Sequence, residues 1–275
     1  MENRRKGFIL VRRAFVIRGF RMKKNRVKEM LRERRTTVGA WATIGHADVA
    51  EIMAQQGFDW IVFDTEHAPL SIGTVQNMMQ ATSSSDIVPI VRVAWNDMVL
   101  IKLALDTGAL GVVVPWVNTK EEAIRAVRAT RYAPLGNRGV GPRRAASYGA
   151  ELIDYLRSAD EEMLVVCQIE TQEAITNLEQ ILSVEGVDAV FIGPSDLSTS
   201  LGHKGDWHHP NVERAISKVL DASMNAGVAA GIYAMSIEDA VRHAADGFRF
   251  IALGSDTGFL VSGCKSALAA LGRKK

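Results

Sequence analysis

Two acidic residues, Glu170 and Asp196, stand at the ends of two short apolar runs. The runs are VVCQIE and DAVFIGPSD, and a segment with helical periodicity (171–183) separates them. An apolar run, a helix and a second apolar run predict a βαβ unit with parallel, neighbouring strands. The two carboxylates would then lie side by side at the carboxyl ends of the strands, where α/β folds bind their ligands.

This pair of carboxylates has two interpretations. A carboxylate at the end of a buried strand is costly to desolvate unless it is paired or bound to a cation. No basic residue stands near either acid in the sequence, so the pair indicates a hard divalent cation, which prefers oxygen ligands. The alternative is that each acid caps the next helix, because Glu170 precedes TQEAI and Asp196 precedes LSTS. The spacing alone is compatible with both.

The elements that must position these acids alternate regularly from Thr37 onwards. Each predicted strand is followed by a helical segment, with a long loop at 131–149 and another at 197–210. Eight βα units in about 240 residues have the number and size of a (β/α)8 TIM barrel, so we predict a single α/β domain over residues 36–275. The predicted strands are 37–44, 59–68, 87–95, 110–117, 163–170, 188–196, 228–235 and 248–256.

Polar residues gather at the predicted strand ends, where barrel enzymes build their sites. Each has an ordinary explanation as well: His67 could cap a helix, Arg92 could pair with Glu66 or Asp64, and Asp106 could be a solvated helix residue. Their combination on one rim is what indicates a catalytic site. In chain order they are Asp64 and His67 after the second strand, Arg92 in the third, Asp106 at the end of the third barrel helix, Gln168 and Glu170 at the fifth, and Gly193, Ser195 and Asp196 at the sixth.

Six segments of the chain resemble the HpcH/HpaI-type class II pyruvate aldolases, the family of 4-hydroxy-2-oxoheptanedioate aldolase and 2-dehydro-3-deoxyglucarate aldolase. The resemblance runs from about Val38 to the last helix, in compatible order and spacing. Trp116 departs from it, because Met or Leu is more usual at that position. The segments are VFDTEHAPLS, IVRVAWND, ALDTGALGVVVPWVNT, RYAPLGNRGVGPRR, CQIET and VFIGPSDLS.

The resemblance implies a role for each candidate. Glu170 and Asp196 would hold a divalent cation (Mg²⁺, Mn²⁺ or Co²⁺), Arg92 would contact the 2-oxo oxygen, and His67, partnered with Asp106, would move protons. It also implies a homo-oligomer (a hexamer, as a trimer of dimers) and a place in the catabolism of aromatic compounds. A cytoplasmic location is indicated instead by the two cysteines, Cys167 and Cys264, which lack metal-ligand spacing and suit thiols in a reducing compartment. The remaining substrate-binding positions are matched by Trp41, Asp64 and Gln168, and by Gly193 and Ser195 in the turn whose backbone receives the substrate carboxylate.

The implied reaction is the reversible cleavage of 4-hydroxy-2-oxo acids to pyruvate and an aldehyde, such as 4-hydroxy-2-oxoheptanedioate to pyruvate and succinate semialdehyde. Breaking a C–C bond beside a 2-oxo acid leaves an enolate, which a divalent ion stabilises as a Lewis acid. Arg92 adds a permanent donor to the same oxygen, and the imidazole of His67 suits proton transfer from the C4 hydroxyl. No lysine closes a predicted strand, which argues against a Schiff-base aldolase.

The charge of the chain is unevenly distributed. Residues 1–35 hold 14 Lys and Arg against three acids, whereas the remaining residues hold 19 against 28. The basic segment is open to three interpretations: a targeting or membrane-surface segment, a disordered arm, or untranslated codons before a true start at Met22, which would make 1–21 a mis-assigned beginning. The acidic body gives no reason to expect nucleic-acid binding, and no apolar run approaches a membrane span of roughly 18 residues.

Three other motifs have weaker functional interpretations. The glycines of 136–141 lack the strand-then-helix context of a dinucleotide fingerprint, and this basic loop could instead reach a neighbouring copy or an acidic substrate. His203, His208 and His209 lack zinc-ligand spacing. GSDTGF after the last strand is similar to a phosphate-binding turn. A citrate- or malyl-CoA-type barrel lyase and a non-catalytic assembly protein remain alternatives to the aldolase.

Overall fold

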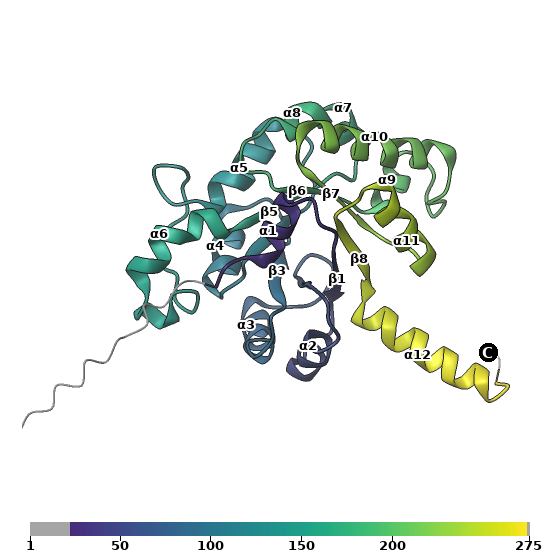
Figure 1. Ribbon diagram of the computed structural model, residues 1–275, viewed down its shortest axis with the longest axis horizontal. Coiled ribbons are helices and arrows are strands. Elements are labelled where there is room, and N and C mark those ends of the chain that lie inside the picture. The colour runs from purple at the N-terminus through teal and green to yellow at the C-terminus, as the bar shows by residue number, and fades with distance from the viewer. Residues whose placement is uncertain (1–22, 274–275) are drawn as a thin grey trace, which may run out of the picture.

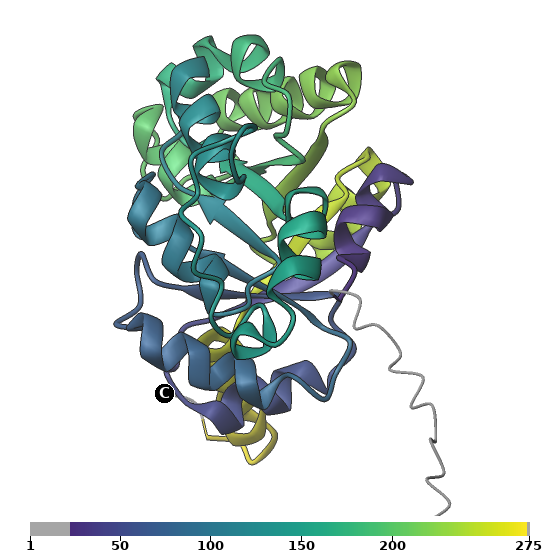
Figure 2. The same cartoon turned by 90° about the vertical axis from the view of Figure 1, so that its left-hand side faces the viewer.

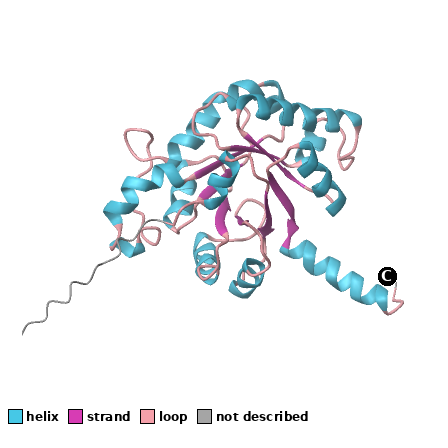
Figure 3. Ribbon diagram, in the orientation of Figure 1, coloured by secondary structure: helices cyan, strands magenta, loops and turns pink. Residues whose placement is uncertain are grey.

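Eight parallel strands close into a barrel in the order in which they occur in the chain, as the computed structural model shows for residues 23–273 (Figures 1 and 3). The prediction of a (β/α)8 barrel is therefore confirmed. The interpretations of the segment before Lys23, including a start at Met22, lie outside the described residues. The strands are β1 (Thr37–Ala42), β2 (Trp60–Asp64), β3 (Val88–Arg92), β4 (Gly111–Val114), β5 (Leu164–Gln168), β6 (Ala189–Ile192), β7 (Ala229–Tyr233) and β8 (Phe250–Ser255).

The helices follow the predicted alternation, with two differences. Segment 171–182 forms two short helices because Asn177, with φ −95° and ψ 10°, interrupts them and donates its side-chain N–H to the carbonyl of Asn118 at 2.9 Å. The predicted loop 197–210 begins as a helix that Pro194 starts at its first position. The helices are α1 (Arg26–Arg32), α2 (Ala47–Ala54), α3 (Ile72–Ala81), α4 (Met98–Asp106), α5 (Lys120–Thr130), α6 (Leu152–Glu162), α7 (Gln172–Thr176), α8 (Leu178–Leu182), α9 (Pro194–Ser200), α10 (Pro210–Ala226), α11 (Ile237–Asp246) and α12 (Asp256–Ala270), with a short 3₁₀ turn at Ser147–Gly149.

Large aromatic side chains fill the inside of the barrel. Trp60 stacks on Phe250 with ring centroids 4.0 Å apart, and Trp41 stacks on Phe191 at 5.0 Å. Space for them comes from glycine: a Cβ on Gly39 would stand 2.1 Å from the Trp60 ring and 2.4 Å from its carbonyl oxygen. We call these four aromatic residues the aromatic floor, because they support the pocket described below.

Helix α1 covers the amino ends of the strands. Val27 and Leu31 are buried, and Lys28 donates to the carbonyl of Met163 at 2.7 Å and pairs with Asp188 at 3.0 Å. This part of the basic N-terminal segment therefore packs against the barrel.

Helix α12 points away from the barrel (Figure 1) and recedes behind it in Figure 2. Its first turn is anchored, since the carboxylate of Asp256 accepts the N–H groups of Thr43 and Ile44 at 2.8 and 2.7 Å. From Thr257 onwards its residues are exposed, including Phe259, Leu260, Val261 and Leu268. Within the described part of the chain, no helix is long and apolar enough to cross a membrane.

Candidate active site

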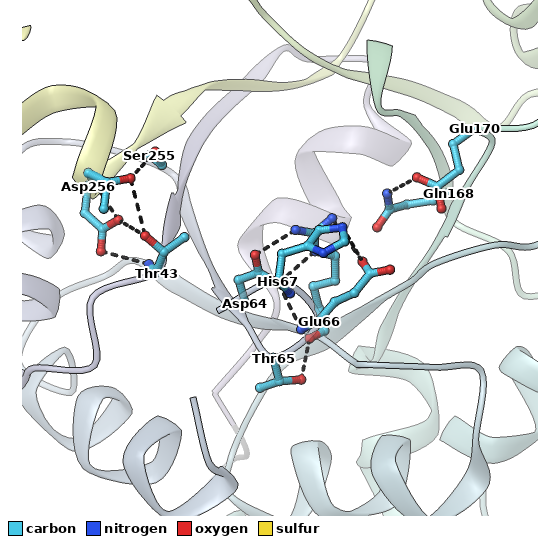
Figure 4. A network of polar contacts seen from close by, with 11 residues as sticks. Thr43, Asp64, Thr65, Glu66, His67, Gln168, Glu170, Ser255 and Asp256 are labelled. Atoms are coloured by element: carbon cyan, nitrogen blue, oxygen red, sulfur yellow. Dashed lines mark hydrogen bonds and ion pairs between the residues drawn. The ribbon is translucent and has the colours of Figure 1, made fainter. Parts of the chain in front are cut away.

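The carboxyl ends of β2 and β3 hold a bidentate ion pair between Asp64 and Arg92, which are partners in the strand register. Arg92 donates from Nε to Oδ1 at 3.0 Å and from Nη2 to Oδ2 at 2.7 Å, an arrangement that fixes the plane of the guanidinium. Asp64 Oδ1 also accepts the N–H groups of Glu66 and His67, so the same carboxylate shapes the loop that follows β2 (Figure 4).

Glu66 and His67 lie at the open side of this ion pair. Glu66 Oε2 is 3.1 Å from Nη1 of Arg92 and 3.9 Å from Nε2 of His67. Burial raises the pKa of Glu66 to about 7; the Arg92 charge opposes this shift, and the charges of Asp64 and Asp196 add to it. The imidazole of His67 is 63% exposed and so faces solvent at the mouth of the site.

Glu170 lies just beyond the end of β5 and is buried. Its Oε1 accepts a hydrogen bond from the backbone N–H of Trp116 at 2.9 Å, and its Oε2 accepts one from Nε2 of Gln168 at 2.7 Å. Burial raises its pKa to about 7 although the Trp116 N–H lowers it, and the Asp196 charge raises it further. The capping interpretation is wrong for Glu170, because the side chain of Thr171 caps α7.

The oxygens of Glu170 and Asp196 converge in front of Gly193, the N-cap of α9. A Cβ at Gly193 would stand 3.4 Å from Glu170 Oε2 and 3.5 Å from Asp196 Oδ2, so the space that the missing side chain leaves is bordered by both carboxylates. Two converging carboxylates suit a hard divalent cation. Within residues 23–273 no set of three or more His, Cys, Asp or Glu side chains is arranged as metal ligands.

These side chains border a pocket of about 280 Å³ at the carboxyl ends of the strands. Of the ten candidate residues from the sequence, eight line this pocket. A ninth, Glu170, accepts a hydrogen bond from Gln168, which is one of the lining residues. A larger cavity of about 400 Å³ lies at the amino ends of the strands and has no acidic residue in its lining, so the chemistry belongs to the smaller one. The eight are Trp41, Asp64, His67, Arg92, Gln168, Gly193, Ser195 and Asp196.

Asp106 is the tenth candidate, and it lies elsewhere. It ends α4, which runs back from the carboxyl end of β3 toward the amino end of β4, and its Oδ1 pairs with Nη2 of Arg138 at 2.8 Å. Arg138 is buried, with Tyr132 and Tyr155 against its guanidinium, rather than extended toward a substrate. The expected contact between Asp106 and His67 is therefore not formed within one copy of the chain.

Residues 37–263 match the sequence model described as HpcH/HpaI aldolase/citrate lyase. The chain belongs to this family. It is 45% identical over 247 residues to the 4-hydroxy-2-oxo-heptane-1,7-dioate aldolase of Klebsiella pneumoniae, covering 90% of this chain and 93% of that protein. The crystal structure of an HpcH/HpaI aldolase/citrate lyase family protein from Burkholderia cenocepacia superposes with a TM-score of 0.87 at 36% identity, over 90% of this chain and 100% of that one. The citrate synthase SbnG superposes at 0.80 with 29% identity, over 88% and 96%.

The other motifs have structural explanations in this HpcH/HpaI chain. His209 caps α10, His203 stacks on it with ring centroids 3.4 Å apart, and His208 contacts Glu213 at 3.0 Å. In GSDTGF, the N–H groups of residues 257 and 258 already donate to the side chains of Asp256 and Ser255. A phosphate at this turn would therefore meet the carboxylate of Asp256, which would repel it.

Two features of the HpcH/HpaI site were not predicted from the sequence. The sequence indicates Glu66 only as a structural partner of Arg92, although Glu66 directly precedes His67 in the segment VFDTEHAPLS. The backbone N–H of Trp116, which holds Glu170, comes from a residue with φ 54°, a left-handed conformation that is uncommon for a large side chain. Nothing in the sequence signals that conformation.

Proposed function

We propose that this protein is a class II aldolase that reversibly cleaves 4-hydroxy-2-oxo acids to pyruvate and an aldehyde, with 4-hydroxy-2-oxoheptanedioate as the first substrate to test. The observation that carries the proposal is the convergence of Glu170 and Asp196 in front of Gly193, beside a guanidinium that Asp64 holds in place. Identity of 45% to an aldolase of that substrate supports it.

Glu170 and Asp196 would hold the divalent cation, Mg²⁺, Mn²⁺ or Co²⁺. When bound, the cation supplies Lewis-acid polarisation of the 2-oxo acid. The chain contributes the geometry: the N–H of Trp116 and the amide of Gln168 each fix one oxygen of Glu170, so its carboxylate is oriented before any ligand arrives.

Arg92 would donate to the 2-oxo oxygen of the substrate and to the enolate oxygen that replaces it. Asp64 engages Nε and Nη2, and Nη1, which lies 3.1 Å from Glu66 Oε2, is the nitrogen that would donate to the substrate. Because the guanidinium is shielded and held before the reaction, it stabilises the developing charge without reorganising.

His67 would accept the proton of the C4 hydroxyl during cleavage and return it during condensation. Its exposed position supports a role toward the aldehyde side of the pocket, where the leaving fragment would meet solvent. The first turn of α9, at Gly193 and Ser195, would receive the substrate carboxylate, because the N–H groups of a helix start have no partners within the helix. The Trp41 ring would form the base of the pocket.

We infer that the chain works as a homo-oligomer, with a hexamer (trimer of dimers) as the expected form. The exposed apolar residues of α12 are costly in water, and a second copy would cover them. Asp106 can serve as the partner of His67 only if the two residues come from different copies. A cytoplasmic location suits the two free thiols, Cys167 and Cys264.

The test is pyruvate release, coupled to lactate dehydrogenase, across a panel of 4-hydroxy-2-oxo acids. We expect activity with wild type, loss of activity in EDTA, and recovery with Mn²⁺, Mg²⁺ or Co²⁺. The matched control is Glu170→Gln, which keeps the size of the side chain but removes the charge that holds the cation. Full turnover in chelator, or an imine trapped by borohydride, would refute the metal mechanism.

A further inference from the structure

Glu66 has no part in the reaction as proposed, yet its carboxylate lies between the two side chains that handle charge and protons. Its Oε2 is 3.1 Å from Nη1 of Arg92 and 3.9 Å from Nε2 of His67 (Figure 4 shows Glu66 beside His67). Its side chain is only 10% exposed. The same oxygen is therefore within ion-pair distance of Arg92 and lies beside the imidazole of His67, with which it forms an ion pair only when that ring is protonated.

The backbone that carries Glu66 is fixed on both sides. Thr65 donates to the carbonyl of Arg92 twice, from its N–H at 3.0 Å and from its hydroxyl at 2.7 Å. Asp64 Oδ1 accepts the next two N–H groups, of Glu66 and His67. The backbone from which the Glu66 side chain extends is thus held by the same strand ends that hold Arg92.

The contact is one of charge rather than a well-aligned hydrogen bond. Glu66 Oε2 is shielded from solvent and has no hydrogen-bond partner, although Nη1 of Arg92 lies within ion-pair distance. A shielded carboxylate oxygen without a hydrogen bond is unfavourable for folding. The raised pKa of Glu66, caused first by burial, reflects the same cost. An acid that destabilises its own surroundings and lies against the reacting groups is better explained by function than by stability.

We propose that Glu66 is a positioning residue that orients Nη1 of Arg92 toward the substrate oxo oxygen and attracts the imidazole of His67 once the ring has taken up a proton. This inference rests on the proposed aldolase function. Asp64 determines the plane of the guanidinium through Nε and Nη2, and Glu66 determines the direction of the remaining nitrogen. The negative charge of Glu66 repels an anionic substrate, so its contribution lies in orientation and not in binding.

The variant that tests this role is Glu66→Gln, which keeps the shape of the side chain and removes its charge. With Mn²⁺ present, kcat for pyruvate release should fall about 10–100-fold, as it does when supporting carboxylates are lost at other sites. KM should stay the same or fall, because one acid fewer repels the substrate. A structural defect would raise KM instead.

A second readout does not depend on turnover. Oxalate has the shape and charge of the pyruvate enolate, and its binding can be followed through tryptophan fluorescence, because the Trp41 ring lies 5.7 Å from the Arg92 guanidinium carbon. Glu66→Gln should bind oxalate with Mn²⁺ at least as tightly as wild type. Its Tm at mildly alkaline pH should equal or exceed that of wild type, because a neutral amide replaces an acid whose ionised form burial disfavours.

Asp188→Asn is the matched control. Asp188 is also a shielded carboxylate paired with a cation, Lys28 at 3.0 Å, and it accepts the N–H of Val165, but it lies at the amino ends of the strands. This variant should lose thermal stability and keep its kcat. A Glu66→Gln kcat within about twofold of wild type would overturn this inference and leave the proposed function standing. A loss of kcat accompanied by higher KM and lower Tm would do the same. A wild-type protein that releases no pyruvate would overturn the proposed function and this inference with it.

Discussion

Two inactive variants of this protein, Asp106→Asn and His67→Ala, should restore activity to each other when they assemble into the same oligomer. Within one copy, Asp106 ends α4 and pairs with Arg138, and it makes no contact with His67. The resemblance to HpcH/HpaI aldolases nevertheless implies that these two residues act as a proton-transfer pair, as proposed above. Both statements hold only if each site combines His67 of one copy with Asp106 of another.

The size of the effect follows from the composition of the mixed oligomer. At equal amounts of the two variants, an intact His67 is present in half of the copies and an intact Asp106 in half of their neighbours, so about a quarter of the sites are complete. Asp106→Asn also removes the acid that pairs with the buried guanidinium of Arg138. Losing one partner of such a pair costs up to about 3–5 kcal/mol. That loss corresponds to a Tm lower by roughly 6–20 °C for a domain of this size.

The assay is pyruvate release by oligomers that contain both variants, co-expressed with different tags and purified by both tags in sequence. The control is the pair His67→Ala and Arg92→Ala. These two residues line the same pocket of one chain, so no mixed oligomer contains a complete site and activity should stay at the level of the parents. Mixed Asp106 and His67 oligomers no more active than either parent would refute the shared site. Wild-type kcat in Asp106→Asn alone would remove Asp106 from the chemistry.

Three further predictions concern single features. Arg92→Ala should slow both cleavage and the exchange of pyruvate methyl protons by about 10²–10³, since both pass through the enolate; Arg92→Lys should recover little, because one ammonium cannot replace the two bonds to Asp64. Deuterium uptake at the wild-type rate in Arg92→Ala would assign the enolate role to another residue. Deleting residues 1–21 should leave solubility and turnover intact, because α1 begins at Arg26; an insoluble or inactive product would contradict this. Cys167 should resist a thiol reagent until the protein is unfolded, because burial raises its pKa to about 12; rapid labelling of Cys167 in the native protein, located by peptide mass spectrometry, would show that β5 opens.

The barrel could be predicted because buried parallel strands are nearly continuous apolar runs, and eight of them alternate with helices. The meeting of Glu170 and Asp196 also followed from the sequence, since neighbouring parallel strands end at the same rim. Side chains on loops carry no such periodicity, and so the direction of Glu66 could not be derived. Asp106 is the residue for which the pattern misleads: it is counted with the rim residues, although a helix after a strand runs back and ends at the opposite side of the barrel.

The last helix shows a different limit. Segment 257–272 was predicted as an ordinary barrel helix, and its helical state is confirmed by α12. Apolar residues occur all around α12, a pattern typical of a helix buried on every side. The distribution of apolar residues indicates that such a helix is buried against other parts of the protein. It does not indicate whether those parts belong to the same barrel or to another copy of the chain.

The aromatic floor restricts how this protein can diversify. A side chain at Gly39 would meet the Trp60 carbonyl oxygen at 2.4 Å, and one at Gly231 would meet the Phe250 carbonyl oxygen at 2.8 Å. Because part of the obstruction in each case is backbone, replacing an aromatic residue does not by itself make room. Descendants of this protein, natural or selected in the laboratory, should therefore keep glycine at these two positions while other residues around the pocket change. Libraries that place side chains at Gly39 or Gly231 would consist mostly of chains that cannot form this barrel.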